Sequence, residues 1–267
     1  MKKAASFALG CKVNQYESEA IAELFAEKGY EIVGIDEEAD VYVINTCTVT
    51  NFGDKKSRQL IRKVKRQNEN AIVAVVGCYA QTAPKELMEI AGVNLVIGTK
   101  DRAQIVEMVE QYDRANGVEN HVSDIMKERV FEPLSIQKLA NRTRAYLKIQ
   151  DGCSQYCSYC IIPYARGPIR SREPQEVVAE VKRLAENGFK EVVLTGIHVA
   201  SYGKDRRDTS LLDILKQVHE VEGIERIRFS SIEPNFATEE FVSELAKLPK
   251  VCDHFHLSLQ SGCNKTL

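Results

Sequence analysis

Short apolar runs rich in β-branched residues alternate with amphipathic stretches along the chain, and this rhythm constrains the fold more than any other feature. The runs VYVINT (41–46), AIVAVVG (71–77) and LVIG (95–98) are continuously apolar, as strands covered on both faces should be. Helices fit the intervals between them. The pattern therefore predicts the α/β class with parallel sheets, whose functional side chains lie at the carboxyl ends of the strands.

The first series of elements covers residues 1–115 and predicts one compact α/β domain with a parallel sheet. Its first helix is expected to begin at a capping box, with Asn14 as the cap and Glu17 as its partner, and to end at Gly29. A last helix is predicted from about Asp101 to Tyr112. Residues 116–143 lack sustained periodicity and are predicted to be a linker between domains.

The second series, residues 144–267, predicts another sheet or barrel of βα units. Its strand-like runs are AYLKIQ (145–150), EVVLTGI (191–197), RIRFSS (226–231) and HFHLSLQ (254–260). A helix is expected from Pro174 to about Gly188. The 267 residues, of which 44% are hydrophobic, suffice for two cores, in agreement with two domains.

The sequence favours a cytoplasmic protein with no membrane association. No stretch approaches the ~20 apolar residues of a membrane span, and the first residues are not expected to form a signal peptide, because they reach polar and acidic residues after a short apolar run. In a reducing compartment the eight cysteines are expected to stay thiols and to serve a metal or catalytic site. The net charge of −2 neither favours nor excludes a nucleic-acid partner.

Three cysteines, Cys153, Cys157 and Cys160, follow the first strand of the second series within eight positions. Thiolates are soft ligands that suit zinc or an iron–sulfur cluster. A structural zinc site closes with four ligands, and the stretch contains no histidine or fourth cysteine. A cubane cluster needs one ligand per iron, so three cysteines would leave one iron open for another ligand. We favour the cluster and keep zinc as the alternative.

Another three cysteines, Cys11, Cys47 and Cys78, each end a predicted strand of the first domain, in the stretches FALGC, VINTC and VVGC. One cysteine at a strand end could be a small buried hydrophobic residue. Three of them converge on one edge of a parallel sheet, which indicates a common site.

The stretch CSQYCSYCIIPYARGPIRSR resembles the signature of the radical S-adenosylmethionine (SAM) enzymes. Together with GCKVNQYESE, NTCTVTN and GCYAQ, it makes the whole chain similar to the methylthiotransferases of that superfamily. The resemblance implies a partial radical SAM (βα) barrel in residues 144–267. It also implies two [4Fe-4S] clusters, a catalytic one on Cys153, Cys157 and Cys160 that binds SAM, and an auxiliary one on Cys11, Cys47 and Cys78. Cys252 and Cys263 match no ligand position and are interpreted as structural.

The segment GCKVNQYES is similar to the branch of this family that modifies N6-threonylcarbamoyladenosine beside the anticodon of tRNA. The implied reaction removes hydrogen from C2 of the adenine by a radical and installs a methylthio group. The implied partners are a tRNA anticodon stem-loop and an electron donor such as flavodoxin. Alternative substrates are isopentenyladenosine in tRNA and a ribosomal protein. The alternative function is that of a non-catalytic RNA-binding fragment stabilised by bound metal. Family members have a six-stranded barrel and a C-terminal TRAM domain, so we expect a C-terminally truncated chain.

Cofactor and RNA contacts are predicted at several further positions. Thr195 and Gly196 end the second strand of the barrel series, where the superfamily binds the methionine amino group, and Glu233 and Gln260 end the next two. Seven cations and no acid lie between Lys55 and Arg66, which predicts a basic helix face for phosphates. A second basic group follows the cysteine loop and is the preferred candidate. The residues predicted to contact RNA are Lys55, Lys56, Arg62, Arg166, Arg170 and Arg172.

Overall fold

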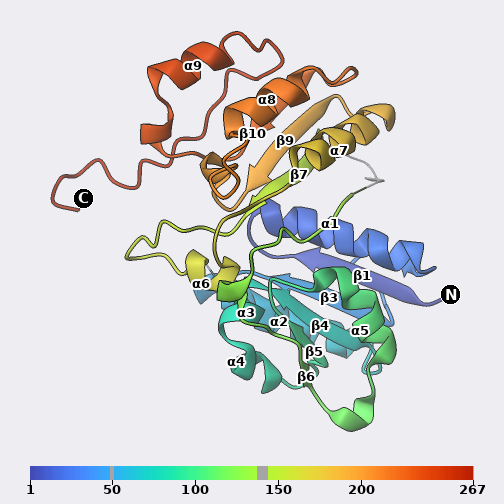
Figure 1. Cartoon of the computed structure of the whole chain (residues 1–267). Coiled ribbons are helices and arrows are strands. Elements are labelled where there is room, and N and C mark those ends of the chain that lie inside the picture. The colour runs from blue at the N-terminus through green and yellow to red at the C-terminus, as the bar shows by residue number, and fades with distance from the viewer. Residues whose placement is uncertain (49–50, 137–143, 267) are drawn as a thin grey trace. The chain divides into compact units, whose positions relative to one another are not determined.

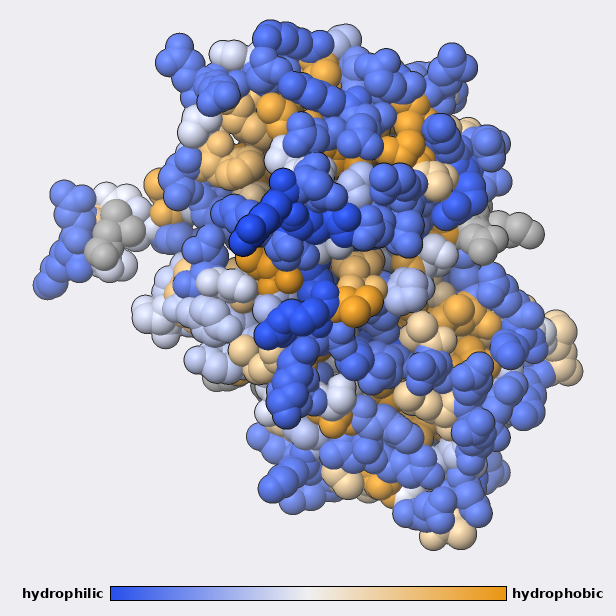
Figure 2. Space-filling view, viewed as in Figure 1, coloured by the Kyte–Doolittle hydropathy of each residue, from blue (hydrophilic) through white to orange (hydrophobic). Residues whose placement is uncertain are grey.

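The structure, a computed structural model, describes residues 1–48, 51–136 and 144–266 (Figure 1). The described chain forms two compact units. The first contains residues 1–136 and 153–168, and the second contains residues 144–152 and 169–266. In the view of Figure 2 the surface is mostly hydrophilic, with hydrophobic residues in small patches. None of the helices in the described ranges is long and apolar enough to cross a membrane.

The first unit contains a six-stranded parallel sheet with the order β2-β1-β3-β4-β5-β6. The three apolar runs predicted as strands form β3, β4 and β5, which confirms the α/β class. The order β2-β1-β3-β4-β5 is that of a doubly wound sheet, whose chain direction reverses between β1 and β3. The strands are β1 (Lys3–Ala8), β2 (Glu31–Ile32), β3 (Val41–Thr46), β4 (Ile72–Gly77), β5 (Leu95–Ile97) and β6 (Glu119–Asn120).

Helices cover both faces of this sheet because successive strand side chains point to opposite sides. Val43 on β3 packs in a core with Ile21 of α1 (Lys12–Glu27), and α5 (Ile105–Gln111) joins the same core. Ile44 packs on the other face with Ile61 of α2 (Asn51–Gln67), together with α3 (Cys78–Thr82) and α4 (Pro84–Met88). The continuous apolar character of the strands thus reflects burial on both sides.

The first helix begins earlier than the capping-box pattern predicts. Cys11 is the cap of α1, and Asn14 and Glu17 lie inside the helix with both side chains fully buried. The prediction of Asn14 as a cap is therefore wrong, since Asn14 lies inside the helix and its side-chain nitrogen donates to the carbonyl oxygens of Leu9 and Thr46. The helix does end at Gly29, where φ is +83°. The helix predicted to begin at about Asp101 consists of the 3₁₀ turn η1 (Arg102–Gln104) followed by α5.

Most of the predicted linker belongs to the first unit. Residues 116–136 begin at the last residue of η2 (Arg114–Asn116) and contain β6 and η3 (Ile125–Lys127). The Tyr16 hydroxyl donates to the Leu134 carbonyl at 2.7 Å, and Gln81 donates to the Ser123 carbonyl at 2.8 Å. These bonds attach the segment to the unit, so the first unit extends to 136 and does not end near 115. Residues 137–143 of the predicted linker lie outside the described residues.

The second unit contains a four-stranded sheet with the order β10-β9-β7-β8. Three parallel strands match predicted runs, and β8 adds an unpredicted antiparallel edge. The helix predicted from Pro174 is α7, and with α8 it buries an apolar stripe that includes Val181 and Leu215. The elements are β7 (Arg144–Asp151), β8 (Arg170–Ser171), α7 (Pro174–Glu186), β9 (Glu191–Gly196), η4 (Val199–Ser201), α8 (Leu211–His219), β10 (Arg226–Phe229), η5 (Pro234–Phe236) and α9 (Glu239–Leu245).

The run HFHLSLQ does not form the predicted strand. It makes a single bridge, between Ile232 and Leu257, and the apolar side chains of Phe255, Leu257 and Leu259 remain exposed. The alternating pattern is that of a half-buried strand, but Phe255, which contacts Phe229, is still 42% exposed, and Leu257 and Leu259 are 43% and 63% exposed. The strand prediction for 254–260 is therefore wrong.

Candidate functional site

The three cysteines of the first domain lie together at the carboxyl edge of its sheet. Cys11 follows β1, Cys47 follows β3 and Cys78 follows β4. Ala8 pairs with Asn45 and Thr46 pairs with Gly77, so the three neighbouring strands end side by side. Sheets of this order bind ligands at the point where the chain direction reverses, which here lies between β1 and β3. The topology therefore places these thiols at the usual ligand-binding edge.

Gly10 forms a backbone cradle between two of these cysteines. Its φ of +103° lies in a region that L-residues rarely adopt. A β-carbon at this position would lie 2.6 Å from Cys47 Cβ and 2.8 Å from Cys47 Sγ. The absence of a side chain at Gly10 thus lets the Cys47 thiol lie against the turn that leads to Cys11.

Asn14 connects the strand ends to the cysteines. Its side-chain nitrogen donates to the carbonyl oxygens of Leu9 and Thr46, both at 2.9 Å, and so holds the ends of β1 and β3 together. Its oxygen accepts from Cys11 Sγ at 3.5 Å and from Arg166 Nη2 at 2.6 Å. The buried amide thus has partners on both sides, as a buried polar group requires.

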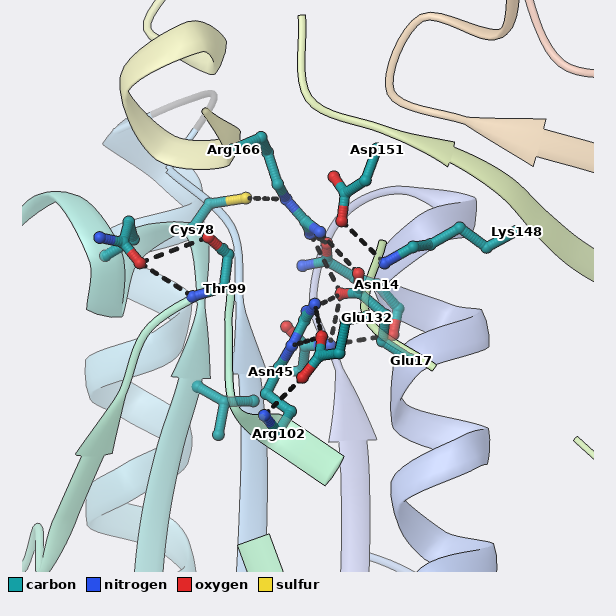
Figure 3. A network of polar contacts seen from close by, with 12 residues as sticks. Asn14, Glu17, Asn45, Cys78, Thr99, Arg102, Glu132, Lys148, Asp151 and Arg166 are labelled. Atoms are coloured by element: carbon teal, nitrogen blue, oxygen red, sulfur yellow. Dashed lines mark hydrogen bonds and ion pairs between the residues drawn. The ribbon is translucent and has the colours of Figure 1, made fainter. Parts of the chain in front are cut away.

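Arg166 completes a chain of contacts between the thiols (Figure 3). Its guanidinium is fully buried, and Nε donates to Cys78 Sγ at 3.1 Å. Nη1 donates to Glu17 at 2.6 Å, and Glu17 also pairs with the buried Arg102 at 2.6 Å. Burial raises the pKa of the Cys78 thiol, and the Arg166 charge acts in the opposite direction. Cys11, Asn14, Arg166 and Cys78 therefore form one continuous polar cluster.

The loop with the second cysteine triad is closed at its base and attached to the same unit. Cys153 N donates to the Gly167 carbonyl at 3.0 Å, and Cys160 N donates to the Cys157 carbonyl at 2.9 Å. The loop ends in α6 (Ile162–Arg166), which packs against α3. Thr99 Oγ1 donates to the Ala165 carbonyl at 2.7 Å. The loop is thus anchored through its last helix, while the Cys157 thiol remains exposed.

The donor chemistry of both triads fits a cubane cluster. All eight cysteines are among the described residues, and none forms a disulfide. No three His, Cys, Asp or Glu side chains in the described ranges come close enough to share one metal ion. A cubane makes a different demand, because each thiolate binds its own iron and the sulfurs surround the cluster. The sheet edge with Cys11, Cys47 and Cys78 and the closed loop with Cys153, Cys157 and Cys160 each supply three thiols for such a cluster.

The structure places Arg166, Arg170 and Arg172 in the interior, which contradicts their prediction as an RNA-contacting surface. Their exposed fractions are 0%, 2% and 5%. Each guanidinium has a carboxylate in its own unit: Arg166 pairs with Glu17 at 2.6 Å, as above, Arg170 with Asp151 at 3.7 Å and Arg172 with Glu180 at 2.6 Å. Buried and paired cations cannot contact phosphates on a surface, so this part of the prediction is wrong.

Helix α2 retains the basic face that the sequence predicts. Ile61 and Val64 are fully buried, while Lys55, Lys56 and Arg62 are exposed. Two other cations of this helix pair with carboxylates on the same unit, Arg58 with Glu86 and Lys63 with Asp36. The helix begins four residues after Cys47, so the cations of α2 follow a strand end that carries one of the thiols.

In the second unit, Gly196 and Glu233 are two of the four predicted SAM-binding residues. They are connected through Gln150 and His198, which the prediction missed. A β-carbon on Gly196 would lie 2.7 Å from Gln150 Oε1, and the same oxygen accepts from His198 N at 2.8 Å. The His198 ring contacts Glu233 on one side and Ser201 on the other. Gln150 and His198 both lie in segments that end strands, KIQDG and TGIH, which was the signal available in the sequence.

The other two SAM-binding candidates are placed differently. Thr195 lies next to Gly196 on β9, but its side chain is 1% exposed and therefore belongs to the interior. Gln260 is exposed, with a φ of +65°, in the segment that does not form a strand. The polar cluster at the strand ends thus consists of Gln150, His198 and Glu233 beside the bare backbone of Gly196.

Comparison with known proteins gives two family matches and several close relatives. Residues 3–98 match the Uncharacterized protein family UPF0004, and residues 147–267 match the Radical SAM superfamily. The chain is 50% identical to the threonylcarbamoyladenosine tRNA methylthiotransferase MtaB of Bacillus subtilis and 42% identical to that of Aquifex aeolicus. It is 35% identical to the tRNA-2-methylthio-N(6)-dimethylallyladenosine synthase of Dictyoglomus thermophilum. These alignments include 100%, 99% and 97% of the chain, which spans 59%, 64% and 59% of the relatives' lengths.

A solved structure shares the fold. The radical SAM methyltransferase TsrM from Kitasatospora setae, solved with tryptophan and a SAM analogue, aligns with a TM-score of 0.61. The sequences are 17% identical, and the alignment covers 94% of this chain and 58% of TsrM. At this identity the likeness concerns the fold, and it agrees with the predicted partial radical SAM barrel.

Proposed function

Because the chain belongs to the radical SAM methylthiotransferase family, we propose that the protein containing it converts N6-threonylcarbamoyladenosine beside the anticodon of tRNA to its 2-methylthio derivative. The observation that carries the proposal is the presence of two thiol triads in one unit, one at the sheet edge and one in the loop anchored by α6. The relatives of 50% and 42% identity support this nucleoside, and the dimethylallyladenosine synthases of 35% identity make isopentenyladenosine the alternative.

Each triad has a separate role in this proposal. Cys153, Cys157 and Cys160 hold a [4Fe-4S] cluster whose open iron binds SAM, and Cys11, Cys47 and Cys78 hold an auxiliary [4Fe-4S] cluster. When bound, the first cluster and SAM would supply a radical able to remove hydrogen from C2 of adenine, a carbon without a leaving group for polar substitution.

The remaining residues bind and orient the substrates. Gly196 leaves backbone space at the strand ends, and Glu233 offers a carboxylate for the amino group of SAM beside His198. The exposed cations Lys55, Lys56 and Arg62 on α2 bind phosphates of the anticodon stem-loop through charge. An electron donor such as flavodoxin completes the set of partners.

Anaerobic reconstitution followed by iron and sulfide analysis tests the cluster assignment. Two cubanes require about eight irons per chain, whereas one or two zinc ions would contradict radical chemistry. Cys157→Ala in the intact protein should abolish cleavage of SAM to 5′-deoxyadenosine, because no spare ligand replaces the lost thiolate. The matched controls Cys252→Ala and Cys263→Ala should cleave SAM at the parent rate.

A second measurement separates the two triads and identifies the substrate. Cys47→Ala should lose about four irons and all methylthiolation, yet retain some uncoupled SAM cleavage. Complete loss of cleavage, with the first cluster spectroscopically intact, would contradict separate roles. Mass spectrometry of tRNA nucleosides from a strain without the gene then shows which 2-methylthio derivative disappears. Loss of the isopentenyl derivative would assign the alternative substrate.

A further inference from the structure

Arg166 donates one of its nitrogens to a cysteine sulfur, and this contact is not needed for its ion pair with Glu17. Its two terminal nitrogens already serve Glu17 and Asn14, at 2.6 Å each. The third nitrogen, Nε, donates to Cys78 Sγ at 3.1 Å. Figure 3 shows the Arg166 side chain extending towards Asn14 and Glu17, with the Cys78 sulfur beside its Nε. All three partners come from α1 and α3.

The chemistry of this contact favours a negatively charged sulfur. Arginine remains protonated in proteins, and a neutral thiol is a weak acceptor. The bond from this buried cation is strongest when the sulfur also carries negative charge, as a metal-bound thiolate does. Glu17 balances Arg166 and is shared with Arg102, which holds the guanidinium in place and leaves Nε aimed at Cys78.

We propose that Arg166 is a positioning residue that raises the reduction potential of the auxiliary cluster by donating its Nε–H to the Cys78 sulfur. The inference rests on the proposed assignment of Cys11, Cys47 and Cys78 to that cluster. Reduction adds one negative charge to a cluster, and both a hydrogen bond to its sulfur and a nearby cation stabilise that charge. Arg166 ends the helix that follows the loop of the other triad, so the same side chain ties that loop to the auxiliary ligands.

The test isolates the auxiliary cluster in the full chain with Cys153, Cys157 and Cys160 all replaced by Ala. The midpoint potential is measured by titration with dithionite and detection of the reduced cluster by electron paramagnetic resonance. In this background Arg166→Gln should disfavour the reduced state about tenfold, a lowering of about 59 mV for one electron. Arg166→Lys retains the charge without the fixed donor, so it should give a smaller lowering.

Arg102→Gln is the matched control. Arg102 is equally buried and pairs with the same Glu17 carboxylate, so its loss disturbs the same ion-pair network. If Arg166 acts through the sulfur, Arg102→Gln should shift the potential far less than Arg166→Gln. Equal shifts in the two variants would show that the network as a whole sets the potential, and would overturn the assignment to Arg166.

A second measurement keeps Arg166 in place, so its result does not depend on whether the Arg166 variants fold. Chains grown with ¹⁵N-arginine should show a nitrogen coupling to the reduced auxiliary cluster in pulsed electron paramagnetic resonance, and Arg166→Lys should abolish it. About four irons with neither a coupling nor a shift in potential would overturn the inference and leave the cluster assignment standing. Absence of iron from the background variant would instead overturn the cluster assignment and the inference together.

Discussion

Replacing Gly10 by alanine should damage the auxiliary site through a predictable displacement of Cys47. The new β-carbon would lie 2.6 Å from Cys47 Cβ and 2.8 Å from its Sγ, whereas carbon atoms in contact normally lie about 3.5–4.0 Å apart. Cys47 must therefore shift by about 1 Å. The φ of +103° adds backbone strain for any residue with a β-carbon. We expect a loss of about 2–5 kcal/mol from strain and overpacking together.

Gly29→Ala provides the matched control because it introduces the same change without a neighbour. Gly29 has a φ of +83°, and a β-carbon there would meet nothing within 4 Å. It should lose about 1–2 kcal/mol from backbone strain alone. The difference between the two variants, about 1–3 kcal/mol, then measures the crowding of Cys47.

Two assays read out this pair of variants in the chain that lacks the loop cysteines. Urea unfolding of the metal-free protein reports the change in free energy, and iron analysis after anaerobic reconstitution reports loading of the auxiliary site. Gly29→Ala should keep about four irons, whereas Gly10→Ala should lose most of them. Equal stability and equal iron content in both variants would refute the cradle and make Gly10 an ordinary turn residue.

Three further predictions concern charge. Replacing the exposed cations of α2 should weaken tRNA binding, and filter binding across a salt series should show the log–log slope falling by about 0.7 to 0.9 per lost contact. The variant is Lys55→Ala/Lys56→Ala/Arg62→Ala, and the control is Lys182→Ala, which replaces an exposed cation on α7. An equal loss of tRNA affinity in the control would contradict a specific role of α2. Burial of Glu128 would raise its pKa, but hydrogen bonds from Lys100 and two backbone N–H groups lower it from 4.5 to about 2. The lowered pKa of Glu128 therefore contributes stability above pH 4.5 that is lost as the pH falls towards 2. Urea unfolding of Glu128→Gln should show a free energy of unfolding that depends less on pH over that window. An unchanged pH dependence would contradict the prediction. Glu17→Gln should cost about 3–5 kcal/mol in urea unfolding because it removes the carboxylate that pairs with the buried Arg166 and one of the two carboxylates that pair with Arg102, and a loss below 1 kcal/mol would contradict this role.

The strands and the first cysteine triad could be predicted because their signals are local. A continuous β-branched run such as VYVINT specifies a buried strand, and the cysteine that follows it must lie at the strand end. The capping-box prediction failed because Asn14 and Glu17 show the same spacing whether they cap a helix or lie inside it. Only the burial of α1 against β1 and β3 separates the two cases.

The sequence by itself determined the α/β class, the strand ends that carry Cys11, Cys47 and Cys78, and the thiol-rich loop after β7, because neighbouring residues encode each of them. The tertiary structure decided the role of Arg166. Its carboxylate partner Glu17 lies 149 positions away, and an arginine looks equally suited to solvent, phosphate or a buried ion pair until that partner is placed. Burial of a charge depends on distant partners that offset its desolvation, and those partners meet only when the chain folds.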